Sequence, residues 1–134
     1  MVCIQCQSET RVINSRLQKK ANQVWRRRKC GNCRTIFTTR EVAQYELAWL
    51  VRTSSTLRPF HRDKLLLSII ASIQHRPNAL EDASALTETV MNKLLYTAPA
   101  GVIDASTITR IVQVALNRFD KAASVHYQAF HRNN

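Results

Sequence analysis

Four cysteines in two closely spaced pairs are the residues of this chain best suited to chemistry. Cys3 and Cys6 form the first pair, Cys30 and Cys33 form the second, and the sequence contains no fifth cysteine. Zinc takes four cysteine sulfurs at about 2.3 Å in a tetrahedron, and two residues between paired ligands let one tight turn present both sulfurs. The pattern predicts one structural zinc ion per chain, with no open position for catalysis.

Two other uses of paired cysteines fit the sequence less well. A redox dithiol needs one such pair beside a β-α-β pattern, and no such pattern is visible. A pair of disulfides needs an export signal, and with Cys3 so near the start of the sequence we expect none. We therefore expect a reduced, cytoplasmic compartment, in which thiolates are available to bind metal.

A run of four basic residues, 26–29, directly precedes the second cysteine pair. Residues 1–40 carry ten Lys or Arg against Glu9 alone, a net charge of +9, whereas residues 41–134 carry only +2 of the chain's +11. In proteins with such a charge asymmetry, the more basic part is typically the part that binds a polyanion. We predict that residues 1–40 bind double-stranded DNA. The predicted DNA contacts are Arg16, Arg26, Arg27, Arg28 and Lys29.

Alternation along an extended strand divides this basic run between two faces. Arg26 and Arg28 are expected on one face, and Arg27 and Lys29 on the other with Trp25. Arg and Lys grip phosphates, and Arg also binds guanine edges. Three alternatives stay open: a solvated cationic edge that blocks strand pairing, an RNA- or ribosome-associated zinc ribbon with a helical partner-binding domain, and an assembly adaptor that docks on a protein through its helical half.

The elements around these residues predict two small domains with an α+β fold. Residues 1–42 are expected to form a small β zinc ribbon, because segments 10–16, 24–28 and 35–39 are rich in β-branched and aromatic residues and a polar turn lies at 18–22. A ribbon of this size depends on its metal for much of its folding free energy. No run of apolar residues is long enough to span a membrane.

Residues 43–134 are expected to form a mainly helical domain that opens with a short β-hairpin within residues 42–59. Apolar residues at helical spacing then predict four helices with one buried stripe each. The first starts at Asp63 and is stopped by Pro77, and the second follows Asn78. Pro99 and Gly101 then interrupt the chain, and the last two helices are predicted from Asp104 or Ser106 to Phe119 and from Lys121 to Phe130. Inward positions include Leu80, Ala83, Ala122, Ala123, Tyr127 and Phe130.

Several short motifs occur along almost the whole chain. They are Asn14-Ser15-Arg16, Arg26-Arg27-Arg28-Lys29-Cys30-x-x-Cys33, Phe37-Thr38-Thr39-x-Glu41, Arg58-Pro59-Phe60-x-x-x-Lys64-Leu65, Arg76-Pro77 and Phe119-Asp120-Lys121-x-Ala123. In sequence and order these motifs resemble those of the NrdR-type transcriptional repressors of ribonucleotide reductase genes. The resemblance implies a zinc ribbon that binds DNA boxes upstream of reductase genes, followed by an ATP-cone domain over residues 43–134.

The resemblance also implies a regulatory ligand, ATP or dATP, whose identity sets the homo-oligomeric state and through it operator binding. The family's nucleotide contacts map onto Val51, Arg52, Thr53 and Lys64, with Tyr127 near the base. No enzyme activity is implied, and the sequence shows no nucleophile and base motif and no second metal-ligand spacing among its four histidines. The chain departs from the family at the hairpin residues 52–55, at Arg58 in place of an acidic residue, and at Ser124 in place of a tyrosine.

Overall fold

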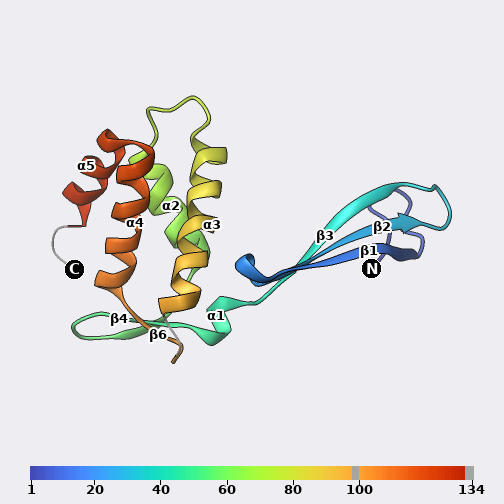
Figure 1. Cartoon of the computed structure of the whole chain (residues 1–134), viewed down its shortest axis with the longest axis horizontal. Helices are drawn as coiled ribbons and strands as arrows, with labels where there is room; N and C mark the ends of the chain where they lie inside the picture. The colour runs from blue at the N-terminus through green and yellow to red at the C-terminus, as the bar shows by residue number, and fades with distance from the viewer. Residues whose placement is uncertain (98–99, 132–134) are drawn as a thin grey trace. The chain divides into compact units, whose positions relative to one another are not determined.

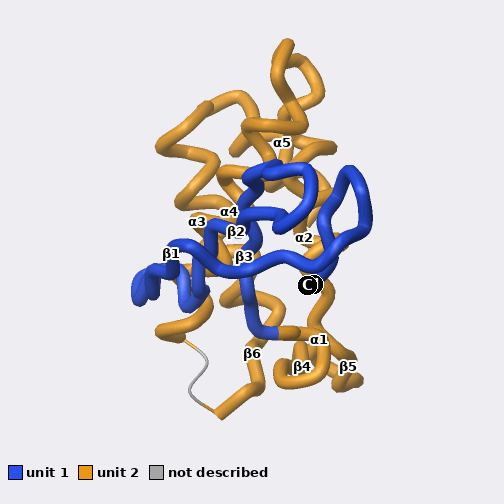
Figure 2. Tube along the Cα trace, turned by 90° about the vertical axis from the view of Figure 1, so that its right-hand side faces the viewer, with its two compact units in different colours: residues 1–43 blue, residues 44–134 orange. Residues whose placement is uncertain are grey.

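The computed structural model describes residues 1–97 and 100–131 and confirms the predicted α+β fold class. The chain separates into two compact units, residues 1–43 and residues 44–134, which Figure 2 shows in blue and orange. Within the described residues, no helix has both the length and the apolar character needed to cross a membrane.

Unit 1 is a three-stranded antiparallel sheet in the order β1-β2-β3 (Figure 1). The predicted turn between the first two strands contains a 3-10 helix, and Asn22 closes it in a left-handed conformation with φ 47°. A bulge at Ile13 shifts the register of β1 against β2 between Val12 and Asn14. The elements are β1 (Thr10–Gln18), η1 (Lys19–Ala21), β2 (Gln23–Cys30) and β3 (Ile36–Val42).

Unit 2 combines helices with a small sheet. In that sheet β4 lies in the middle, antiparallel to β5 and parallel to β6. The elements are α1 (Tyr45–Ala48), β4 (Leu50–Arg52), β5 (Leu57–Pro59), α2 (Arg62–Ser72), α3 (Ala79–Thr97), β6 (Val102–Asp104), α4 (Ala105–Phe119) and α5 (Lys121–Phe130).

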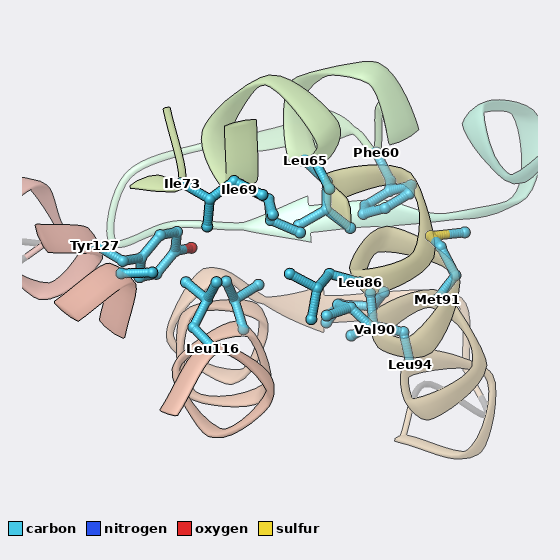
Figure 3. Close-up of a cluster of buried hydrophobic side chains, with 14 of the residues drawn as sticks. Phe60, Leu65, Ile69, Ile73, Leu86, Val90, Met91, Leu94, Leu116 and Tyr127 are labelled. Carbon is cyan, nitrogen blue, oxygen red and sulfur yellow. The ribbon is translucent and has the colours of Figure 1, made fainter. Parts of the chain in front are cut away.

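One apolar core holds unit 2 together. Figure 3 shows side chains of α2, α3, α4 and α5 converging on a common centre. Ile69, Leu94 and Leu116 are completely buried there, and Trp49 and Phe60 extend the core with ring centroids 5.5 Å apart. Each of the helices α2 to α5 therefore buries an apolar stripe, and burial of these stripes is the main stabilising term of the unit.

Several local predictions for unit 2 were wrong. Tyr45–Ala48 is a helical turn rather than part of the hairpin, and α2 ends at Ser72, before Pro77 is reached. Strand β6 was not predicted at all. The side chains of Leu80, Ala122 and Phe130 are exposed rather than inward, because the buried stripes of their helices pass through other positions.

Gly101 marks the predicted break after α3, and Pro99 lies outside the described residues. The φ of Gly101 is +73°, which disfavours residues with a side chain. A Cβ at this position would also lie 2.9 Å from the carbonyl oxygen of Ala48. Because the Gly101 carbonyl accepts a hydrogen bond from the Leu50 amide, this close approach helps to bring β6 beside β4.

Candidate functional site

The four cysteines meet at one end of the sheet of unit 1. All four sulfurs lie within 4.8 Å of one another, and the Cys3–Cys33, Cys6–Cys30 and Cys6–Cys33 pairs are 3.4–3.5 Å apart. Sulfurs about 2.3 Å from a central zinc in a tetrahedron lie about 3.8 Å from each other. None of the four cysteines is in a disulfide. The cysteines are thus positioned to bind one zinc ion, as predicted.

The two cysteine pairs sit in turns with the same hydrogen bonds. In each turn the first cysteine donates its amide to the carbonyl five residues later, at 2.9 Å in both cases. Its sulfur accepts the amide two residues later, from Gln5 at 3.5 Å and from Asn32 at 3.3 Å. The residues after the second cysteines, Gln7 and Arg34, both have positive φ. Two segments whose equivalent cysteines are 27 residues apart therefore form matching knuckles, and each knuckle directs two sulfurs toward the same point.

The surroundings of the sulfurs favour thiolates at two of the four ligands. Hydrogen bonds with Ser8 lower the pKa of Cys6 to about 5, and hydrogen bonds with Thr35 lower the pKa of Cys33. Burial raises the pKa of Cys30 to about 11. A divalent cation among the four sulfurs would favour the thiolate form of every ligand, so this donor set fits a structural zinc ion.

The register of the sheet separates the predicted DNA contacts. Directly paired residues of neighbouring strands project from the same face. Trp25 pairs with Arg16 and Arg40, and Lys29 pairs with Arg11. These residues, together with Arg27, form one face on which none of the paired strand residues is a carboxylate, and we call it the basic face. The basic face consists of Arg11, Arg16, Trp25, Arg27, Lys29 and Arg40.

Arg26 and Arg28 project from the opposite face and are engaged within unit 1. Arg26 forms an ion pair with Glu41, and the Nε of Arg28 lies 3.3 Å from the Thr39 hydroxyl. The alternation predicted along β2 is therefore present. Arg11 and Arg40 were missed as candidate contacts, because only the pairing of β1 and β3 with β2 brings them beside Trp25. DNA contact by any of these residues stays a prediction.

A cavity of about 250 Å³ in unit 2 brings together most of the predicted nucleotide contacts. Val51, Thr53, Lys64 and Tyr127 all line it. Arg52 does not, and its guanidinium lies 3.8 Å from the Asp104 carboxylate instead. The remaining lining residues, which the sequence did not identify as contacts, are Arg58, Pro59, Phe60, His61, Leu65, Ser68, Ala105, Ile108, Thr109 and His131.

The lining of this cavity combines two kinds of chemistry. Arg58, from β5, and Lys64, from the first turn of α2, contribute positive charge, and no Asp or Glu is among the described residues that line the cavity. Hydroxyl groups of α2 and α4 and the ring of Tyr127 in α5 also line it. Burial raises the pKa of Tyr127, whose hydroxyl therefore stays protonated near neutral pH. A ligand with an anionic group and a flat ring matches this lining.

Comparison with known proteins identifies relatives over the whole chain. Residues 1–41 match a family model described as "Transcriptional repressor NrdR-like, N-terminal domain". Two curated proteins named "Transcriptional repressor NrdR", from Psychrobacter arcticus and Psychrobacter cryohalolentis, are each 30% identical over 134 residues, which cover 99% of this chain and 88% of the relative. With its four cysteines gathered as a zinc ribbon requires, the chain belongs to the NrdR family of transcriptional repressors.

Proposed function

We propose that this chain represses ribonucleotide reductase genes by binding double-stranded operator DNA through the basic face of unit 1. The charge distribution carries this proposal, since five cations share a face with Trp25 and no carboxylate is among the strand residues paired there. Phosphate contacts from such cations supply much of the affinity for DNA and orient the protein on the duplex. The relatives, both named as transcriptional repressors, support the repressor role.

Polar residues on the basic face offer a route to sequence specificity. Asn14 and Thr38 pair with Arg27 in the register and share its face. Arg binds guanine edges bidentately and Asn binds adenine edges in the same way, so this row of three can distinguish bases. The cations around it would hold the sheet against the phosphates.

Two neighbouring arginines of β2 provide a matched test of this face. Arg27→Ala is expected to weaken binding to reductase promoter DNA and, if a phosphate contact is lost, to reduce the salt slope by about 0.9. Arg26→Ala removes the same charge from the opposite face and is expected to have a smaller effect. Fluorescence anisotropy titrations at several salt concentrations measure both quantities.

Random DNA and a matched RNA serve as competing ligands in the same titrations. The proposal requires tighter binding to the promoter than to either of them. Equal binding to all three would reject operator recognition, and preference for RNA would favour the alternative in which Trp25 stacks on an unpaired base. Equal losses in Arg27→Ala and Arg26→Ala would reject the assignment to one face.

Unit 2 is proposed to bind ATP or dATP in its cavity and to control assembly and DNA binding through it. The cations of its lining suit the phosphates, and the hydroxyl groups and the Tyr127 ring suit the base. A nucleotide that binds one homo-oligomeric assembly more tightly than another must shift the population toward it. This linkage lets the protein act as a switch without any chemical step.

Lys64 and Lys121 form a matched pair for testing the nucleotide site. Lys64 lines the cavity, and Lys121 is exposed and does not. Lys64→Ala is expected to lower ATP affinity about tenfold or more, because a charge-assisted contact to phosphate is lost, whereas Lys121→Ala is expected to bind as wild type. Calorimetry measures the affinity, and sedimentation velocity with ATP and dATP measures the assembly. No heat and no change in mass with either nucleotide would reject the proposal.

A further inference from the structure

His131 follows the last residue of α5 and covers Tyr127 in the cavity of unit 2. The two rings are stacked, with centroids 3.9 Å apart and planes inclined by 12°. His131 Nδ1 lies 2.9 Å from the Tyr127 carbonyl oxygen, and Nε2 lies 3.2 Å from the Ser68 hydroxyl. Since a carbonyl oxygen only accepts, Nδ1 carries a hydrogen and the imidazole is fixed at both nitrogens.

Tyr127 is only 2% exposed, although it is a lining residue of the cavity, and His131 covers one face of its ring. A nucleobase that stacks on the phenol needs the ring face that the imidazole occupies. The Ser68 hydroxyl, another polar group that lines the cavity, is within hydrogen-bond distance of His131 Nε2. Arg58 and Lys64, the cations of the lining, have no such internal partner among the described residues.

We infer that His131 is an internal competitor for the nucleobase, an inference that rests on the proposed nucleotide binding. The imidazole takes the stacking surface and the hydroxyl that a base would use, so the base binds only when His131 leaves. The observed affinity is then the intrinsic affinity reduced by the fraction of molecules in which the ring is displaced. The same displacement breaks contacts at the C-terminal end of α5, which couples occupancy of the cavity to this helix end.

The competition acts on the base and not on the phosphates. Removing the imidazole should therefore tighten ATP binding but leave the binding of a triphosphate without a base unchanged. A purely structural role for His131 predicts the opposite, because loss of packing would weaken both ligands. Inorganic tripolyphosphate has no base, so it tests binding to the cations Arg58 and Lys64 alone.

The experiment uses calorimetric titration of the zinc-loaded full chain with ATP and with tripolyphosphate. His131→Ala is expected to bind ATP about 5- to 30-fold more tightly, as one or two modest contacts no longer compete, and to bind tripolyphosphate as wild type does. His131→Phe keeps an aromatic ring over Tyr127 and is expected to bind ATP no more tightly than wild type. His126→Ala is the control, since His126 packs on Phe130 outside the cavity and is exposed.

The outcomes separate this inference from the proposed function. ATP binding that is unchanged or weakened in His131→Ala rejects the competitor role and leaves nucleotide binding standing. Absence of ATP binding in both wild type and His131→Ala rejects nucleotide binding and the inference together. Binding of ATP by His131→Ala alone would support both, with thermal unfolding used to verify that each variant is folded.

Discussion

The two units of this chain are stabilised by different interactions. In unit 2, residues from α2 to α5 and both sides of the hairpin form one buried apolar cluster. In unit 1, the only buried hydrophobic residues among those described are Cys3 and Cys30, and apolar side chains such as Ile13 and Leu17 are exposed. A sheet without an apolar core cannot offset its loss of conformational entropy by burial. Unit 1 must therefore gain its stability from the metal site.

The difference also separates the two proposed tasks. Because a metal site at one end of the sheet stabilises unit 1, neither face of the sheet has to pack against a core. The basic face is therefore available for contact with a ligand. Unit 2 instead has a packed core beside a cavity, where the proposed ligand would compete or cooperate with internal contacts such as the one made by His131. The comparison predicts that the units respond separately to substitutions.

The largest expected effect follows from removing one zinc ligand. Cys30→Ser should abolish zinc binding and unfold unit 1, because structural zinc sites contribute about 10–16 kcal/mol of apparent binding free energy. Unit 2 should keep its thermal transition. Zinc content and far-ultraviolet circular dichroism measure the two responses.

Asn32→Ala is the matched control in the same knuckle, since its amide, which contacts the Cys30 sulfur, is retained. Wild-type zinc content is expected. If Cys30→Ser kept the strands of unit 1 without metal, the account of its stability would be wrong.

A smaller effect, confined to unit 2, is expected from a cavity in its core. Leu116 is completely buried, and Leu116→Ala should lower the free energy of unfolding by about 2–5 kcal/mol. The melting temperature of unit 2 should fall by about 10 °C or more. Val125→Ala, at a residue that is 67% exposed on α5, should have little effect. Loss of zinc from Leu116→Ala would contradict the independence of the units.

The sequence was sufficient to predict features that depend on neighbouring residues. The knuckles follow from cysteine spacing, and the helix predicted from Lys121 to Phe130 is present with these bounds. The single turn at Tyr45–Ala48 and the three-residue strand β6 were missed, because such short segments contain less than two periods of any pattern.

Features that depend on pairing between distant segments could not be predicted. The basic face gains Arg11 and Arg40 only through the register of three strands and the bulge at Ile13. In unit 2, Ser68 and His131 meet across 63 positions in the sequence. The distribution of charge along the sequence identified residues 1–40 as the basic region, whereas the structure is needed to decide which cations share a face.

The smallest expected effect is a pH dependence of unit 2 at Asp120, which caps α5. Its carboxylate accepts hydrogen bonds from the amides of Ala122 and Ala123, and lies 2.8 Å from His75 Nε2 and 3.6 Å from Arg76 Nη1. The hydrogen bond from His75, followed by those from the amides, lowers the pKa of Asp120 below its ordinary value of 3.8.

Because the folded-state pKa is lowered, the carboxylate stabilises unit 2 above the unfolded-state pKa, and this contribution is lost as the pH falls through the folded-state value. Asp120→Asn keeps a side-chain oxygen for the cap and removes the charge, so it should reduce the slope of stability against pH below about pH 5 while retaining the helix. Asp120→Ala removes both and should lower the melting temperature of unit 2 at every pH. Thermal melts between pH 3 and pH 7 measure these slopes. Identical slopes in wild type and Asp120→Asn would mean that other carboxylates determine the acid sensitivity of unit 2, and would leave Asp120 with the cap alone.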